Sequence, residues 1–201
     1  MTVREMAQAA RKASQYLATC STESKNSALQ RIVDNLTAKR EAILSANKDD
    51  MEQAVISKLS GPLVQRLSLE KKFDDVVEGV RQVIKLPDPV GMIQAQRLLD
   101  ENLMLTRLTV PIGVIGVIFE SRPDALVQIA TLCLKSGNAA ILKGGREASR
   151  TNAALFAAID EAIGTHEAFK GALHLAETRA EIKSLLALDN LVDLIIPRGS
   201  N

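Results

Sequence analysis

Short runs of glycine and charged residues recur in the second half of this sequence, and each directly follows an apolar run. They are Glu120-Ser121-Arg122, Lys143-Gly144-Gly145-Arg146 and Pro197-Arg198-Gly199-Ser200. Glycines let a ligand approach the backbone closely, and a helix that starts after such a run offers free N–H groups to a phosphate. Lys143 and Arg146 would add positive charge for the same group. The combination predicts a site for a phosphate-bearing ligand such as a nucleotide.

Each of these runs also has an ordinary explanation. A single glycine-rich turn is most often only a strand-to-helix loop, whereas three at one edge of a sheet favour a binding site. The sequence contains neither G-x-G-x-x-G nor the Walker A pattern, so the common nucleotide fingerprints give no support. Arg122 has two interpretations of equal weight: it holds the carboxylate or phosphate of a substrate, or it forms a structural salt bridge with Glu120.

The elements that must position these runs are strands and helices in alternation from Pro111 onward. The expected strands are GVIGVIF, NAAILK, GALHLA and LVDLIIP, at residues 113–119, 138–143, 171–176 and 191–197. The first helix between them has Pro123 in its first turn and stops at Gly137, a matched start and end. Right-handed crossovers would arrange the strands as a doubly wound parallel sheet, with their carboxyl ends at one edge. The predicted fold class is therefore α/β with a Rossmann-like parallel sheet.

The first part of the chain, residues 1–90, is expected to be helical. Apolar residues recur at helical spacing in the first helix, and a second apolar stripe runs from Leu29 to Leu44. Gly61-Pro62 indicates a break. Ser68 is expected to be the N-cap of a further helix, which Pro87 and Pro89 terminate.

Between these helices and the sheet, the spacing of apolar residues changes from a helical period to the alternation of strands. Residues 92–99 and 103–110 alternate in the manner of two strands, joined by the polar turn Asp100-Glu101-Asn102. A hairpin that lies outside the main core needs another surface to cover it. The segment is therefore either an ordinary sheet hairpin or a contact between subunits, and these two interpretations have equal weight.

Composition excludes several classes of partner. Of 201 residues, 46% are hydrophobic and only 2% aromatic, with no Trp, so few side chains are available to stack on bases. The formal net charge of +1 gives no electrostatic footprint for a nucleic acid or an anionic membrane. The two cysteines, Cys20 and Cys133, make no disulfide framework and no metal-ligand spacing. No secretory signal and no membrane span is apparent, and free thiols favour the cytoplasm. The lack of metal-ligand spacing predicts a chain without a metal.

One long segment, VPIGVIGVIFESRPDALVQIATLCLKSGNAAILKGGREA, resembles the cofactor domain of γ-glutamyl phosphate reductase, also called glutamate-5-semialdehyde dehydrogenase. This family belongs to the aldehyde dehydrogenase superfamily. The resemblance extends over nearly the whole chain, through ANKDD at 46–50, RLSL at 66–69, DPVG at 88–91 and DLIIPRGSN at 193–201. IFESRP and LKSGNAAILKGG distinguish the family from general aldehyde dehydrogenases, which have a different polar run at the first position and Lys-Pro-Ser at the second.

The resemblance implies a reaction in proline biosynthesis, in which NADPH reduces γ-glutamyl phosphate to glutamate γ-semialdehyde and phosphate is released. A cysteine thiolate attacks the acyl phosphate, and the resulting thioester accepts the hydride. It also implies three parts: an N-terminal helical part of the cofactor domain at 1–90, an oligomerisation hairpin at 91–110, and a truncated NADPH-binding core at 111–201. Homo-oligomers would form through the hairpin at 92–110.

Residue roles follow from the resemblance position by position. Lys143 matches a lysine near the adenosine ribose, Gly144 and Gly145 leave room for the 2′-phosphate of NADPH, and Arg146 pairs with it. Pro197, Arg198, Gly199 and Ser200 match the turn before the helix that faces the pyrophosphate. Glu120, Ser121 and Arg122 match the run between cofactor and substrate.

The nucleophile of the family has no counterpart here, because its cysteine lies downstream of the pyrophosphate helix and this chain stops at Asn201. Cys133 is expected to be a buried core residue and Cys20 has no His beside it, while His166 and His174 are expected to be structural. No catalytic residue is therefore assigned. We expect the chain to be a fragment or truncated product, corresponding to the N-terminal portion, that is inactive alone. The alternatives are a non-catalytic nucleotide-binding or oligomerisation module, and another acyl-activating aldehyde dehydrogenase that handles a thioester; ESRP disfavours the latter.

Overall fold

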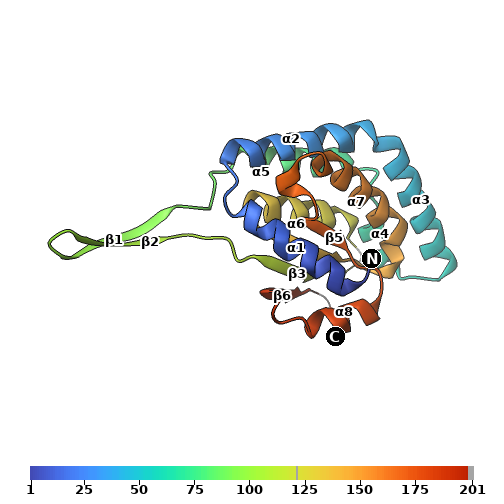
Figure 1. Ribbon diagram of the computed structural model, residues 1–201. Coiled ribbons are helices and arrows are strands. Elements are labelled where there is room, and N and C mark those ends of the chain that lie inside the picture. The colour runs from blue at the N-terminus through green and yellow to red at the C-terminus, as the bar shows by residue number, and fades with distance from the viewer. Residues whose placement is uncertain (121, 199–201) are drawn as a thin grey trace.

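The computed structural model describes residues 1–120 and 122–198, apart from the side chain of Arg179 (Figure 1). It is an α/β fold with a four-stranded parallel sheet, surrounding helices and a separate two-stranded hairpin, which confirms the predicted fold class. The helices are α1 Val3–Leu17, α2 Thr22–Ala38, α3 Arg40–Ile56, α4 Gly61–Leu67, α5 Phe73–Lys85, α6 Pro123–Lys135, α7 Ser149–Gly164 and α8 Arg179–Leu186. Short 3₁₀ turns are η1 Arg146–Ala148 and η2 Glu167–Phe169. The strands are β1 Ile93–Asp100, β2 Leu103–Leu108, β3 Val114–Ile118, β4 Ala139–Lys143, β5 Leu173–Leu175 and β6 Leu194–Pro197.

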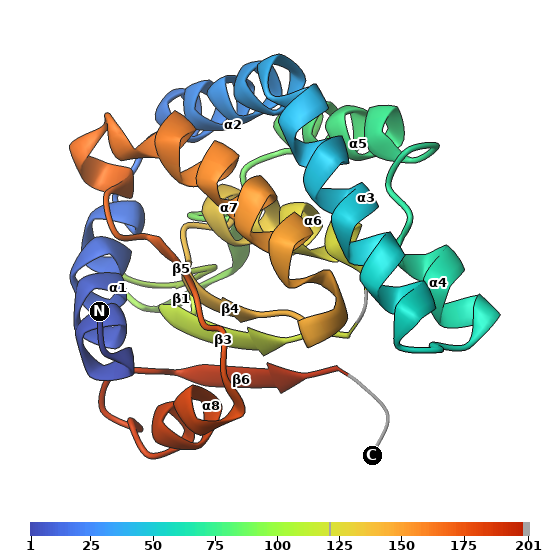
Figure 2. The ribbon, with the colours of Figure 1, turned by 90° about the vertical axis from the view of Figure 1, so that its right-hand side faces the viewer.

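Along the chain, strands are added to the parallel sheet first on one side of β3 and then on the other. Its order is β5-β4-β3-β6, so the chain steps outward from β3 through β4 to β5 and then returns to the far side of β3. Right-handed crossovers then require α6 and α7 on one face and α8 on the opposite face. The point of reversal lies between β3 and β6, whose carboxyl ends point the same way (Figure 2). In open sheets of this kind, ligands bind at that point.

A continuous apolar core joins the N-terminal helices to the sheet. Helix α1 buries Leu17 and Ala10, α2 buries Leu29 and Ile32, and these pack in one cluster with the fully buried residues of β3 and β4. The central strands are buried on both faces because helices cover them from both sides. The helices at 1–90 therefore hold the sheet in place.

The prediction that Ser68 caps a helix is wrong. Helix α5 begins only at Phe73, and Ser68 has extended backbone after the end of α4. Leu67 and Leu69 on either side of Ser68 are fully buried, and the side chain of Asn47 bonds the backbone of both. These contacts hold the segment extended. Pro62 lies in the first turn of α4, so the expected break is the start of a short helix.

The hairpin β1–β2 projects away from the rest of the molecule (Figure 1). Its antiparallel register places Leu98 opposite Met104 and Gln96 opposite Thr106, and Asn102 in the turn has a positive φ of 62°. Apolar side chains on both faces are about half exposed or more. They are Ile93, Leu98, Leu99, Leu103, Met104, Leu105 and Leu108.

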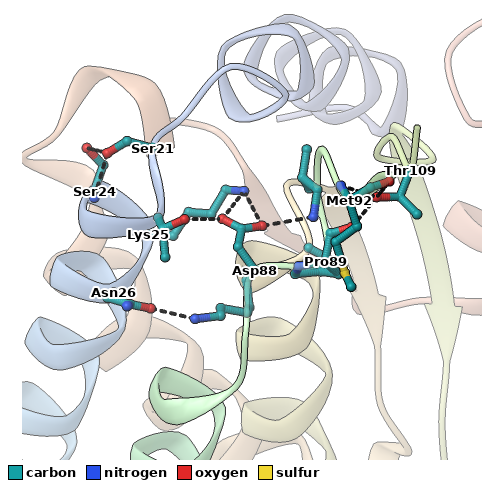
Figure 3. A network of polar contacts seen from close by, with 12 residues as sticks. Ser21, Ser24, Lys25, Asn26, Asp88, Pro89, Met92 and Thr109 are labelled. Carbon is teal, nitrogen blue, oxygen red and sulfur yellow. Dashed lines mark hydrogen bonds and ion pairs between the residues drawn. The ribbon is translucent and has the colours of Figure 1, made fainter. Parts of the chain in front are cut away.

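The root of the hairpin is tied to the body by buried charges (Figure 3). The ammonium of Lys25, on α2, lies 2.9 Å from Oδ2 of Asp88, and only 1% of its side chain is exposed. Asp88 also accepts hydrogen bonds from the hydroxyl of Thr22 and the N–H of Val90. The segment between α5 and β1 is thereby fixed against α2.

Candidate functional site

The carboxyl ends of β3 and β6 open into a cavity of about 260 Å³. Its lining residues are Arg66, Phe119, Glu120, Arg122, Ala125 and Arg198. The backbone N–H of Arg198 donates to the carbonyl of Ile118, at 2.8 Å, which ties the two strand ends together. The cavity therefore lies at the reversal point of the sheet, where the topology favours a ligand.

Arg122 has a carboxylate partner that sequence analysis did not consider. Its Nη2 lies 2.6 Å from Oδ2 of Asp124, in the first turn of α6, and the Asp124 side chain is 6% exposed. The hydrogen bond with Asp124 and the charge of that carboxylate raise the pKa of Arg122. The guanidinium is thus held in its charged form at the wall of the cavity.

A second cavity, of about 280 Å³, lies beyond the carboxyl ends of β4 and β5. Its lining residues are Gly144, Gly145, Arg146, Ser149, Arg150, Asn152, Ala153, Leu175, Ala176 and Glu177. Arg146 is exposed at its rim, while Lys143 is buried and donates through Nζ to the carbonyl of Gly144 at 2.5 Å. The glycine and basic residues that follow β4 are therefore brought together at one opening.

Side chains of the protein itself occupy the place of a Cβ at both glycines after β4, although the one at Gly145 is the end of the flexible Glu147 side chain, which can move. A Cβ on Gly144 would overlap the amide of Asn152, and a Cβ on Gly145 would overlap the carboxylate of Glu147. Asn152 is 3% exposed, and its Oδ1 has no hydrogen-bond partner among the described residues. A buried amide oxygen of this kind is uncommon and, at the wall of a cavity, suits a donor on a ligand.

Six of the predicted site residues line the two cavities, whereas the buried Lys143 is among the lining residues of neither. Glu120, Arg122 and Arg198 line the first, whereas Gly144, Gly145 and Arg146 line the second. Pro197 is the exposed last residue of β6. Ser121, Gly199 and Ser200 lie outside the described residues.

Among the lining residues that sequence reasoning missed are Arg66 in the first cavity and Asn152 in the second. Arg66, on α4, lies nearly fifty residues before β3, so no local spacing signals it. Asn152 lies in the first turn of α7, and the signal in the sequence was an amide side chain close after the glycines.

The cysteines and histidines lie in structural settings. Cys133 is buried in α6, and burial raises the pKa of its thiol to about 12, so it is a poor nucleophile. Burial also raises the pKa of the Cys20 thiol. His166 accepts a hydrogen bond from the N–H of Ala168 at the start of η2. His174 is buried in β5, and burial lowers its pKa.

The described residues contain neither a metal-binding cluster nor a membrane-spanning helix. Within 1–120 and 122–198, no three His, Cys, Asp or Glu residues gather in a way that suits a metal ion. Of the helices in the same part of the chain, none combines the length and the apolar character needed to cross a bilayer.

Comparison with known proteins connects this geometry to a family. No model of a protein family matches the chain. It is 48% identical over 202 aligned residues to a γ-glutamyl phosphate reductase from Ruminiclostridium cellulolyticum, covering all of this chain and 47% of that protein. The crystal structure of γ-glutamyl phosphate reductase from Thermotoga maritima matches all of the chain and 49% of its own, with a TM-score of 0.95 and 35% identity.

The fold extends to more distant enzymes. A benzaldehyde dehydrogenase from Corynebacterium glutamicum has a TM-score of 0.74 at 19% identity, over 98% of this chain and 40% of its own. The chain spans about half the length of the reductases that it matches. Over its whole length it is a homologue of the γ-glutamyl phosphate reductases, and it corresponds to about half of such a protein.

Proposed function

We propose that this chain is the cofactor-binding portion of a γ-glutamyl phosphate reductase that uses NADPH in proline biosynthesis. The observation that carries the proposal is the pair of neighbouring cavities at the carboxyl edge of a sheet that matches known reductases closely. One cavity presents glycines, two arginines and an amide oxygen without a hydrogen-bond partner in the described chain, and the other presents three arginines. An extended dinucleotide that reacts with an anionic substrate needs both kinds of surface.

The residues of the second cavity suit the adenosine end of NADPH. Arg146 at the rim supplies the positive charge that a ribose 2′-phosphate requires. Leu175 and Ala176, after β5, supply apolar surface, and Oδ1 of Asn152 can accept a hydrogen bond from an adenine or ribose donor. NADPH, when bound, supplies the hydride for the reduction.

Glu120 and Arg122 of the first cavity are proposed to hold the substrate, γ-glutamyl phosphate, and Arg198 in the same cavity to face the pyrophosphate of the cofactor. Arg122, fixed by Asp124, presents a charged guanidinium, and Glu120 lines the same cavity. Both described cysteines have a raised thiol pKa, so neither suits a nucleophile at neutral pH. The thiolate that forms the thioester is therefore assigned to the remainder of the reductase.

The exposed hairpin is proposed to join copies of the chain. Apolar side chains on both faces of β1–β2 are exposed, and a two-stranded ribbon of this kind is marginally stable unless another surface covers it. A homo-oligomer in the cytoplasm, built through residues 92–110, fits these observations.

A complementation experiment tests the reductase proposal. The chain is mixed with a separately produced second half of the Ruminiclostridium cellulolyticum reductase, and oxidation of NADPH by γ-glutamyl phosphate is followed by absorbance. We expect activity from the mixture and none from either part alone. An inactive mixture, although both parts are folded and associate with each other, would favour a non-catalytic nucleotide-binding module.

A further inference from the structure

The first turn of α7 forms much of the wall of the second cavity. Ser149, Arg150, Asn152 and Ala153 line that cavity, whereas Thr151, in the same turn, does not. Thr151 is fully buried, and its hydroxyl bonds to α3, which lies beside α7 (Figure 2). The turn therefore presents one side to a ligand and the other side to the protein.

Asp50, on α3, supplies the cap that this turn lacks within its own sequence. Ala148, the residue before α7, has no side chain that could accept a hydrogen bond, and the turn contains no acidic residue. Asp50 is 4% exposed, and its carboxylate accepts the N–H of Thr151 at 2.7 Å and the N–H of Arg150 at 3.3 Å. Two of the N–H groups that a helix N-terminus can offer to a phosphate are thus bonded within the protein.

The hydroxyl of Thr151 extends this contact to a second side chain of α3. It donates to Oδ2 of Asp50 at 2.7 Å and accepts from Nδ2 of Asn47 at 3.2 Å. Nδ2 of Asn47 also donates to the carbonyl of Leu67 at 2.8 Å, next to Arg66 of the first cavity. One buried network on α3 therefore holds the wall of the second cavity and reaches the segment that carries Arg66.

We infer that Asp50 is a positioning residue of the second cavity, which acts through α7 and does not itself line the cavity. Its carboxylate fixes the first turn of α7, and with it the amide of Asn152, before a ligand binds. Oδ1 of Asn152 is buried without a hydrogen-bond partner among the described residues, and such an acceptor serves a ligand best where it is held in place. That the ligand is NADPH rests on the proposed function, whereas the hold on the turn does not.

Hydrogen exchange of the ligand-free 201-residue chain, followed by NMR, tests the hold on the turn. In Asp50→Ala, exchange of the amides at 150–153 should speed up by about fivefold or more relative to the rest of α7, because the turn loses its cap. Asp50→Asn keeps an oxygen acceptor and should lie between Asp50→Ala and the unchanged chain. The matched control is Asp88→Ala, which removes another buried carboxylate contact at the root of the hairpin and should not single out residues 150–153.

Titration with NADPH tests the consequence for binding. Because the turn must be ordered in the complex, loss of an ordinary cap in Asp50→Ala should weaken binding by about fivefold, and Asp50→Asn should recover most of the affinity. Asp88→Ala should bind NADPH as the unchanged chain does. Asn152→Ala should cost less affinity in the Asp50→Ala background than in the unchanged chain, because both substitutions act on the same amide.

Three results would overturn the inference. The first is unchanged exchange at 150–153 in a folded Asp50→Ala chain, and the second is equal weakening of NADPH by Asp88→Ala and Asp50→Ala, since a general loss of stability would then explain both. The third is a fully additive loss in the double variant, which would exclude a role through Asn152. A folded, unchanged chain that binds no NADPH would remove the proposed function, and the exchange measurement alone would then decide whether Asp50 holds the turn.

Discussion

The buried ammonium of Lys25 and the carboxylate of Asp88 form an ion pair between α2 and the root of the hairpin (Figure 3). Both carboxylate oxygens of Asp88 contact Nζ of Lys25, at 3.1 and 2.9 Å. A second buried lysine, Lys135 on α6, bonds Oδ1 of Asn26 and the carbonyl of Ile84 nearby. These contacts join α2, α5, α6 and the root of the hairpin at one place.

Replacing Asp88 should therefore be costly. In Asp88→Ala, the ammonium of Lys25 loses its only recorded carboxylate partner in the described chain while it stays 1% exposed. Removal of one partner of a buried pair typically costs about 3 kcal/mol or more of unfolding free energy. Denaturant unfolding measures this loss. Asp74→Ala, which removes the partner of Arg40 at the surface, is the matched control and should leave the midpoint almost unchanged.

The same carboxylate should make stability depend on pH. Burial on its own would raise the pKa of Asp88, but hydrogen bonds from Val90, Lys25 and Thr22 outweigh it, and the pKa is lowered. The stabilisation is therefore present above the unfolded pKa of about 3.9 and is lost as the pH falls through the folded value. The difference in unfolding free energy between the unchanged chain and Asp88→Asn should shrink from about pH 6 to about pH 3. An equal difference at both pH values would contradict this assignment.

Two glycines should respond to alanine in opposite directions. Gly113 has a φ of +123°, and its Cβ would overlap the carboxylate of Asp193, which accepts the N–H of Val114 and pairs with Arg11. Gly113→Ala should destabilise the fold by about 1–3 kcal/mol. Gly79, inside α5, has nothing within 4 Å of an added Cβ, so Gly79→Ala should stabilise it by about 0.5–1 kcal/mol. Thermal unfolding of both variants checks the signs.

Charge on an apolar position of the hairpin should disrupt association. Leu98 is 63% exposed and lies opposite Met104, so Leu98→Glu places a charge on the face proposed to be covered by another copy. We expect light scattering after gel filtration to show an oligomer for the unchanged chain and a monomer for this variant. The control is Gln96→Glu, which adds the same charge at a polar position two residues away. A monomeric unchanged chain would exclude the hairpin as a self-association surface.

The fold was largely predictable because its signals are local. Apolar runs bounded by Pro123 and Gly137 predicted β3, α6 and β4, and Gly137 has the positive φ of 72° that a helix end of this kind requires. The failure at Ser68 has a long-range cause, since Asn47, twenty residues earlier, fixes the backbone on both sides.

The candidate site was predictable only where it follows strands directly. Glu120, Arg122 and Arg198 follow β3 and β6, and the topology brings them into one cavity. Arg66 reaches that cavity only through the packing of α4, which no pattern near Arg66 reveals. The partner of Arg122 depends on a side-chain direction in the first turn of α6, and spacing alone left that open.

Fluorescence titration with NADPH and NADH tests the central claim most directly. The unchanged 201-residue chain should bind NADPH more tightly than NADH, and Arg146→Ala should weaken NADPH by about tenfold while leaving NADH nearly unchanged. Arg4→Ala, on α1, should bind both nucleotides as the unchanged chain does. Equal weakening of NADPH and NADH in Arg146→Ala would remove the 2′-phosphate from this cavity. Failure of the folded, unchanged chain to bind NADPH at all would contradict the claim itself.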